Sequence, residues 1–266
     1  SSNATMPIIT LTTDLGTNDH YVGVLKGSIL SECADATIVD ISHEIPPYDI
    51  LKAAYTLKNS FKHFPKGTIH IIGVNPEISE KALSLAIYHK GQYFIGANNG
   101  VFSLIFEEQP EMIVEIDIMV NPESITFPTK DIFTKAACHL AKGGTLEMIG
   151  KVTTELNEKA LFRAVSMGNI IKGMAIHIDH YGNIITNIDK TFFKAFGQER
   201  EFKIEFRRGD YDITSISQFY SKVPEGEKLA LFSSTGMLEI AMNKGNASKL
   251  LGMKESDIVR IEFYDR

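Results

Sequence analysis

The chain has 266 residues, of which 44% are hydrophobic and 23% charged, and its formal net charge is −6 at pH 7. This is the composition of a globular protein long enough for two domains or one large one. The negative charge and the lack of a basic run argue against a nucleic-acid partner. No apolar run has the length of a membrane span. Cys33 and Cys138 lie in apolar, helix-like surroundings, which we interpret as buried free thiols of a cytoplasmic protein.

The first half of the chain alternates short apolar runs with segments of helical periodicity. The predicted strands are residues 7–12, 37–41, 68–74, 83–88, 92–95 and 112–118, and the predicted helices are residues 21–31, 49–61 and 131–141. The last of these helices ends before the Gly143-Gly144 pair, as helices commonly do. Such alternation predicts an α/β domain with a mostly parallel sheet flanked by helices.

The pattern changes after Gly150. Residues 151–159 are polar and rich in Lys, Glu and Thr, which is typical of a linker. Short apolar runs separated by turn residues then follow at residues 170–178, 183–188, 202–206, 228–232 and 257–263. This spacing predicts a small all-β barrel or sandwich. We therefore expect an α/β domain over residues 6–152, a linker over residues 153–168 and a small β-barrel over residues 169–266.

The segment LTTDLGTNDHYVGVLKG, residues 11–27, places Asp14 in a glycine-containing turn between a predicted strand and a predicted helix. In α/β sheets, ligands bind outside the carboxyl ends of the strands. The two oxygens of a carboxylate suit the two hydroxyls of a ribose. Alternatively, Asp14 only caps the helix that follows it. This segment alone favours both interpretations equally.

Three further polar segments have a structural and a functional interpretation. Tyr48 follows Pro46-Pro47, so it is either a stacking wall for a flat ring or a staple on the next helix. Asp179 and Asn183 in the sequence DHYGN either form a turn or present a carboxylate and an amide to a zwitterionic amino acid. Residues 233–236 and 245–247 place hydroxyls and backbone amides on both sides of an apolar strand. No set of side chains has metal-ligand spacing, so we expect no metal and no cofactor.

Taken together, these segments resemble a known family. The sequences LTTDLGTNDHYVGVLKG, IVDISHEIPPYDILKAAYTL, FPKGTIH, ANNGVFS, IDHYGNIITNI and SSTGMLEIAMNKGNASKLLG occur in the family's order along nearly the whole chain. The family is that of the adenosine-forming S-adenosylmethionine hydrolases, together with the related fluorinase and chlorinase.

The resemblance implies an α/β domain followed by a β-barrel domain, assembled as a homotrimer. S-adenosylmethionine, as substrate or ligand, would lie between the N-terminal domain of one subunit and the C-terminal domain of its neighbour. Water or hydroxide would attack ribose C5′ and release methionine, giving adenosine; a halide would give the 5′-halo compound.

The resemblance also assigns roles to individual residues. Asp14 would hold the ribose hydroxyls, and Tyr48 and Phe127 would line the sugar and adenine. Asp179 and Asn183 would hold the methionine end, with Tyr181 stacked beside them. The remaining contacts, to the carboxylate, the adenine edge and the reacting centre, would come from Ser234, Asn246, Ala247, Asn75 and Thr129.

The chain departs from the family where the hydrolases activate water. They use an Asp and an Arg in one loop and a His in a TFHGRD segment. Here Asn75, Ala82 and Pro128 occupy these positions, so all three groups are replaced. Glu77, Lys81 and Lys130 lie close in sequence and are candidates to substitute for them.

Two interpretations of function follow. The chain is a weak S-adenosylmethionine hydrolase with an altered catalytic set, or it binds an adenosyl ligand without turning it over. Halide transfer is less favoured. Thr129 matches the small hydroxyl donors of the halogenating relatives, but Ile78 stands where the fluorinase has a threonine.

Overall fold

A computed structural model describes residues 6–77, 79, 82–118, 125, 127–159, 163–206 and 211–265. The chain divides into two compact units, Ser1–Ala160 and Leu161–Arg266. Strand β7 (Gly150–Thr153) belongs to the first sheet and β8 (Val165–Met167) to the second, so the linker predicted over residues 153–168 contains β8 and the last residue of β7. In the described part of the chain, none of the helices has the length and apolar character needed to span a membrane.

The N-terminal sheet is mixed, and the prediction of a mostly parallel sheet is wrong for half of it. Its strands lie in the order β2-β1-β3-β5-β4-β6-β7. The first three pairings are parallel and the last three antiparallel. The reversal occurs because Lys90 and Gly91, both with positive φ, form a tight hairpin turn between β4 and β5. The strands are β1 (Ile8–Thr13), β2 (Thr37–Ser42), β3 (Ile69–Gly73), β4 (Ser84–His89), β5 (Gln92–Ala97) and β6 (Met112–Ile116).

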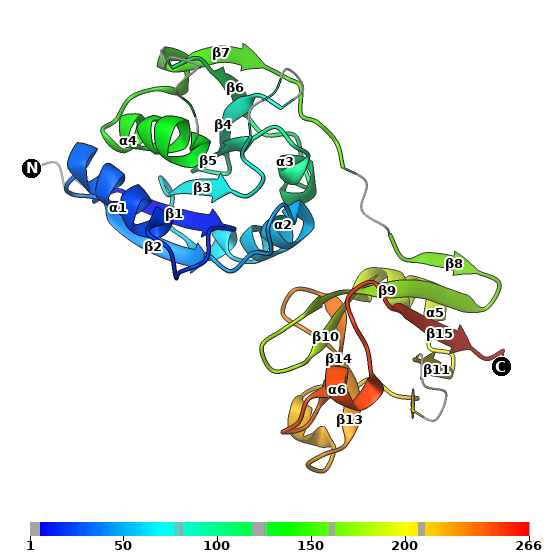
Figure 1. The fold of residues 1–266 in the computed structure, drawn as a ribbon. Coiled ribbons are helices and arrows are strands. Elements are labelled where there is room, and N and C mark those ends of the chain that lie inside the picture. The colour runs from blue at the N-terminus through cyan, green and yellow to red at the C-terminus, as the bar shows by residue number, and fades with distance from the viewer. Residues whose placement is uncertain are drawn as a thin grey trace, which may run out of the picture. The chain divides into compact units, whose positions relative to one another are not determined.

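Helices cover both faces of this sheet (Figure 1). Helices α1 and α4 pack with β1, β3 and β5 in one core, and α2 and α3 pack with β3, β4 and β5 in the other. Their bounds are α1 (Tyr21–Glu32), α2 (Ile50–Lys58), α3 (Val101–Ile105) and α4 (Thr134–Ala141), with short turns η1 (Phe61–His63), η3 (Thr129–Phe133) and η4 (Leu146–Met148). The helix predicted from residue 131 thus begins as the π-helical turn η3. Both cysteines are buried and free, as predicted.

Because β1, β2, β3 and β5 run parallel, their carboxyl ends lie at one edge of the sheet, which we call the carboxyl edge. Thr13, Ser42, Gly73 and Ala97 are the last residues of these strands. The loops that follow carry Asp14, Tyr48, Asn75 and Asn99. The carboxyl edge therefore gathers the polar segments of the first unit.

The C-terminal unit contains an antiparallel eight-stranded sheet in the order β12-β11-β15-β9-β10-β14-β13, with β8 on β9. A bridge between Ile216 and Ala230 brings the two ends of this path together, so the sheet is nearly closed. The unit is not all-β, because helices α5 and α6 pack on the sheet. Bounds are β9 (Ile170–Ile178), β10 (Ile184–Asp189), α5 (Lys190–Gly197), β11 (Phe202–Glu205), β12 (Asp212–Ile213), η5 (Tyr220–Lys222), β13 (Lys228–Phe232), β14 (Met237–Met242), α6 (Ala247–Leu251) and β15 (Ile258–Phe263).

Candidate functional site

Asp14 connects three loops of the carboxyl edge. Its backbone N–H donates to the carbonyl of Gly73 at the end of β3. Its Oδ2 atom accepts hydrogen bonds from the backbone N–H of Tyr48 at 3.2 Å and of Asn75 at 3.4 Å. The side chain does not cap α1, whose N-cap is His20. The helix-cap interpretation is therefore wrong, and the carboxylate holds neighbouring loops in place.

The two residues that donate to Asp14 have unusual backbone conformations. Tyr48 has a φ of 66° and Asn75 a φ of 47°, in the left-handed region that side chains other than Gly and Asn rarely adopt. The Tyr48 side chain is 70% exposed, so its ring does not act as a buried staple on α2. The Asn99 amide donates to the carbonyls of Val74 at 3.2 Å and Asn75 at 2.9 Å, which fixes the loop after β3.

The π-helical turn η3 brings a third group to this edge. Thr129 is buried and packs against Gly73, where a Cβ atom would lie 2.8 Å from the Thr129 hydroxyl. Only glycine therefore fits at the end of β3. The Thr129 hydroxyl has no hydrogen-bond partner within the described ranges. Phe127, just before the turn, makes an edge-to-face contact with Tyr21 of α1 at 5.8 Å between ring centroids.

The positions that replace the water-activating groups lie in two loops. Ala82 forms an isolated bridge with Ser79, which closes the loop that starts at Asn75. Pro128 is the N-cap residue of the turn η3. Of the candidate substitutes, Glu77 is exposed, and Lys130 forms an ion pair with Asp131 at 2.6 Å.

Two residues named from the sequence, Lys81 and Ile78, lie outside the described residues. Within the described parts of the chain, no group of three His, Cys, Asp or Glu side chains could hold a metal ion.

In the C-terminal unit, Asp179 and Asn183 come together in the β9–β10 turn. Asp179 Oδ1 accepts the backbone N–H groups of Tyr181 and Asn183, each at 2.9 Å, and Oδ2 accepts the Asn183 amide at 3.0 Å. The carboxylate thus shapes its own turn, as the structural interpretation requires. The Tyr181 ring is 73% exposed.

The start of α6 lies against this turn. Gly182 has a φ of 83° and packs on the Asn246 side chain, where a Cβ atom would clash. The Gly182 carbonyl accepts the N–H of Ser248, so Asn246 and the buried Ala247 adjoin the turn.

Ser234, in contrast, lies in the β13–β14 turn, at the opposite end of β14 from α6. At a rise of ~3.3 Å per residue, the length of β14 separates Ser234 from the other predicted residues of this unit. A single ligand that touched both ends would have to extend along the strand.

A buried acidic residue, Glu239, lies on the strand β14 that pairs with β10. Glu239 on β14 is 4% exposed and accepts a hydrogen bond from the Tyr220 hydroxyl at 2.6 Å. Burial raises the pKa of Glu239, the negative charge of Asp179 raises it further, and the Tyr220 hydrogen bond opposes both. Sequence analysis did not single out Glu239, because an acid within an apolar strand does not reveal which face it occupies.

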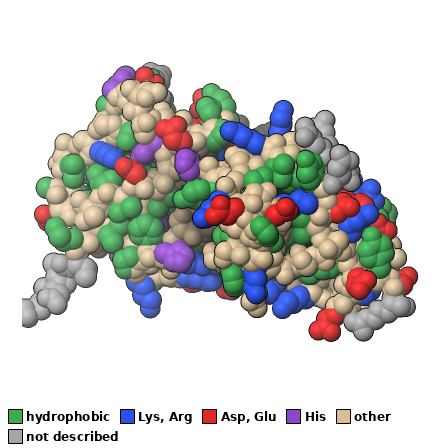
Figure 2. Space-filling view, turned by 90° about the horizontal axis from the view of Figure 1, so that it is seen from below, with side chains coloured by type: hydrophobic (Ala, Val, Ile, Leu, Met, Phe, Trp, Pro, Cys, Tyr) green, Lys and Arg blue, Asp and Glu red, His purple; other side chains and the backbone are tan. Residues whose placement is uncertain are grey.

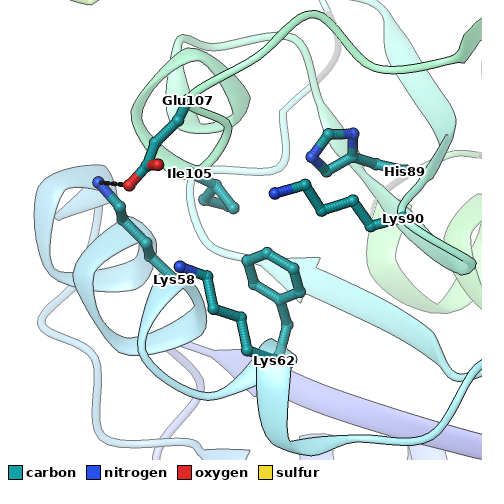
Figure 3. Close-up of a pocket in the computed structure, with 7 residues that line it drawn as sticks. Lys58, Lys62, His89, Lys90, Ile105 and Glu107 are labelled. Carbon is teal, nitrogen blue, oxygen red and sulfur yellow. Dashed lines mark ion pairs between the residues drawn. The ribbon is translucent and has the colours of Figure 1, made fainter. Parts of the chain in front are cut away.

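Two recesses of the N-terminal unit lie away from the predicted site residues. One, of only about 10 Å³, lies beside the β4–β5 turn; it is lined by Lys62 and Lys90, and Lys58 pairs with Glu107 there (Figure 3). The other, of about 510 Å³, is an acidic groove between residues 103–110 and 154–158. On the face shown in Figure 2, acidic and basic side chains are interspersed.

The fold and these polar clusters are those of a two-unit α/β protein with a ligand-type site at the carboxyl edge of its first sheet. Residues 9–150 match the family model described as the SAM hydroxide adenosyltransferase N-terminal domain, where SAM is S-adenosylmethionine. Residues 173–260 match the C-terminal domain of the same family. The chain therefore belongs to the SAM hydroxide adenosyltransferase family.

Individual relatives agree with this assignment. A protein named (R)-S-adenosyl-L-methionine hydrolase, from Methanocaldococcus jannaschii, is 34% identical over 96% of each chain. A fluorinase from Actinopolyspora mzabensis is 24% identical over 98% of this chain and 99% of that protein. The crystal structure of an uncharacterized conserved protein from Thermotoga maritima superposes with a TM-score of 0.86 at 31% identity, covering 96% of this chain and 99% of that one.

Proposed function

We propose that this chain binds S-adenosylmethionine and cleaves it slowly, giving adenosine and methionine. The observation that carries the proposal is the hydrogen bonding of the Asp14 carboxylate. Within the described residues, hydrogen bonds reach only its Oδ2 atom, which leaves Oδ1 at the carboxyl edge for the hydroxyls of a ribose. Family membership supports the ligand class.

The chemistry needs little help from acid groups. Water or hydroxide attacks ribose C5′ in line, and the C5′–S bond breaks as the new C–O bond forms. The electron pair goes to the sulfonium sulfur, which leaves as the neutral thioether of methionine. Holding the substrate in line with a partly desolvated nucleophile is the main requirement. In this proposal Tyr48 and Phe127 line the sugar and adenine, and Asp179, Tyr181, Asn183, Ser234, Asn246 and Ala247 hold the remaining parts of the ligand.

Water must still lose a proton, and this step limits the rate. Asn75, Ala82 and Pro128 offer no group that accepts a proton. A hydrolase of this kind is therefore slow, and a family member that binds the ligand without turning it over is the alternative. The buried hydroxyl of Thr129 is the observation that favours halide as a third possibility.

One incubation separates these functions. The protein is incubated with S-adenosylmethionine, and adenosine and methionine are quantified by chromatography, with the Asp14→Ala variant as control. Equal amounts of adenosine and methionine support hydrolysis, and calorimetric binding without products supports the non-catalytic function. A halogenated nucleoside formed only with added chloride or fluoride would indicate halide transfer. Neither binding nor product would overturn the proposal.

We also propose a homotrimer with the ligand between subunits. The two sets of predicted contacts lie in different units of the chain, and the exposed rings of Tyr48 and Tyr181 suit surfaces that a ligand or a neighbour covers. Sedimentation should give a trimer. A stable monomer that binds S-adenosylmethionine at full affinity would contradict this arrangement.

A further inference from the structure

Strand β1 carries two buried threonine–histidine pairs, one in the interior of the sheet and one at the carboxyl edge. The Thr10 hydroxyl lies 2.6 Å from Nδ1 of His70, and the Thr13 hydroxyl lies 2.7 Å from Nδ1 of His43. Thr10, Thr13 and His70 have no exposed surface, and His43 is 5% exposed. The pairs have the same chemistry, so a difference in their role must come from what each one is connected to.

At the carboxyl edge the pair continues toward the surface. His43 Nε2 lies 2.7 Å from Asp40 Oδ1, and Asp40 Oδ2 accepts a hydrogen bond from Lys26 at 2.7 Å. Burial raises the pKa of Asp40, but the hydrogen bonds from Lys26 and His43 outweigh it and lower the pKa overall. An ionised carboxylate only accepts, so in the neutral form of His43 the hydrogen lies on Nε2, and Nδ1 accepts from Thr13.

This chain of contacts ends on the turn that contains Asp14. The Thr13 oxygen accepts the backbone N–H of Leu15 at 3.3 Å, and the His43 carbonyl accepts the N–H of Gly16 at 2.7 Å. The residues immediately before and after Asp14 are therefore both tied to the network. His43 thus joins the loop after β1 to the loop after β2, from which Tyr48 donates to Asp14.

Among the described residues, the hydrogen bonds of the interior pair lead into the core. His70 Nε2 bonds to Oε1 of Gln92 at 2.6 Å, and the Gln92 amide donates to the carbonyl of Phe61 at 2.9 Å. None of these contacts reaches the loops of the carboxyl edge. The Thr10–His70 pair therefore serves as a control for the Thr13–His43 pair, because the two share their chemistry but not their connections.

We infer that His43 is a positioning residue for adenosyl-ligand binding. Through the Thr13 hydroxyl it fixes the turn that presents Asp14, and Asp40 holds it in the tautomer that can accept from Thr13. This inference rests on the proposed function, in which Asp14 binds the ribose.

Two substitutions at His43 separate its two hydrogen bonds. In His43→Asn the side-chain oxygen can take the place of Nδ1 and accept from Thr13, whereas in His43→Gln the amide reaches only toward Asp40. We expect calorimetric titration with adenosine to show a dissociation constant about threefold to tenfold higher for His43→Gln, the cost of about one hydrogen bond. His43→Asn should bind adenosine within about twofold of the wild-type protein. The matched control His70→Gln should lower thermal stability and leave the dissociation constant unchanged.

A second pair of variants and a spectroscopic measurement keep the test decisive if His43→Gln does not fold. Thr13→Val should weaken adenosine binding, and Thr10→Val should not. Nitrogen-15 NMR of the wild-type imidazoles should show the Nε2–H tautomer for His43.

Each result has a defined meaning. Equal affinity of His43→Gln, His43→Asn and wild-type protein would overturn the role of His43, as would an Nδ1–H tautomer. Equal loss of affinity in His70→Gln and His43→Gln would also overturn it. Wild-type protein that binds neither adenosine nor S-adenosylmethionine would overturn the proposed function, and this role with it.

Discussion

Polar side chains in the interior of the N-terminal sheet and at its carboxyl edge differ in how completely they are hydrogen-bonded. In the interior, Thr10, His70 and Gln92 form a chain that ends on a backbone carbonyl. At the edge, Asp14 keeps one oxygen without a hydrogen bond from the described residues, and the buried Thr129 hydroxyl has no partner among them.

Left-handed backbone also gathers at the edge, at Tyr48 and Asn75. Incomplete hydrogen bonding and backbone strain typically mark functional sites in proteins. Changes at the edge should therefore alter binding and turnover, whereas changes in the interior should alter stability.

The largest effect should come from restoring the water-activating groups at the edge. The combined substitutions Asn75→Asp, Ala82→Arg and Pro128→His should raise the rate of S-adenosylmethionine hydrolysis by about 10²-fold or more, since positioned acid–base groups contribute about 10²–10⁴. Adenosine release followed by chromatography measures the rate, and Asn75→Asp alone serves as the control. A wild-type rate equal to that of a family hydrolase with the intact Asp, Arg and His, assayed in parallel, would contradict this prediction.

The burial of His70 in the interior leads to a prediction about how the stability of the protein depends on pH. Burial lowers the pKa of His70 to about 4, because the charged form loses its hydration. The unfolded chain takes up this proton near pH 6.5, so acid favours unfolding. Between pH 7.5 and pH 4 the wild-type protein should lose about 3 kcal/mol of unfolding free energy through His70.

Denaturation of wild-type protein and the His70→Gln variant at several pH values measures this loss. The stability difference between the two should shrink by that amount toward pH 4. A difference that does not change with pH would show that His70 titrates normally in the folded protein.

Removing the carboxylate at the edge tests the ligand contact directly. Asp14→Ala should weaken adenosine binding by about 10- to 100-fold, because a charged acceptor of two hydroxyls contributes roughly 1.5–3 kcal/mol. Asp14→Asn is the control, since its oxygen can still accept the N–H groups of Tyr48 and Asn75. Calorimetry that finds unchanged affinity in both variants would mean that Asp14 only organises the loops.

The smallest predicted effect is on stability and concerns Glu239 in the second unit. Burial raises the pKa of Glu239 in the folded protein. Ionised Glu239 therefore lowers the unfolding free energy once the pH exceeds the pKa that this side chain has in the unfolded chain. Glu239→Gln removes the charge and keeps an acceptor for Tyr220, so it should stabilise the protein slightly at pH 7. The gain should disappear as the pH falls below about 4.5. A melting temperature that is lower than that of the wild-type protein at pH 7 would show that the charge is needed.

Sequence patterns predicted the long apolar elements well and the connections poorly. Strands β9 and β13 have the predicted bounds, because their residues form apolar or alternating runs between turn residues. Helices α3 and α6 were not predicted, since five-residue helices carry almost no periodic signal. The turn at Lys90-Gly91 was present in the sequence, but its effect on strand direction became clear only from the pairing of β4 with β5.

The candidate site shows the same limit. Asp14 was identified from its turn, and the sequence could place it at a strand end. His43 did not stand out in the sequence, because its role depends on contacts with Thr13 and Asp40, which lie on two different strands. Asn99 lies in a quoted motif, ANNGVFS, but its contact with the loop of Asn75 depends on how β3 and β5 pair. Contacts between strands decide these roles, and a single sequence does not contain the pairing.

The β4–β5 hairpin has a consequence for how the sheet forms. It joins neighbouring residues such as His89 and Gln92, whereas the parallel pair β1–β3 must bring Ile9 to Ile69. Closing a short loop loses less chain entropy, so local pairs form earlier during folding. We expect the middle of the sheet to be built first and the loops around Asp14 to meet last. Substitutions in the hairpin turn should then slow refolding, while substitutions at the carboxyl edge should mainly speed unfolding.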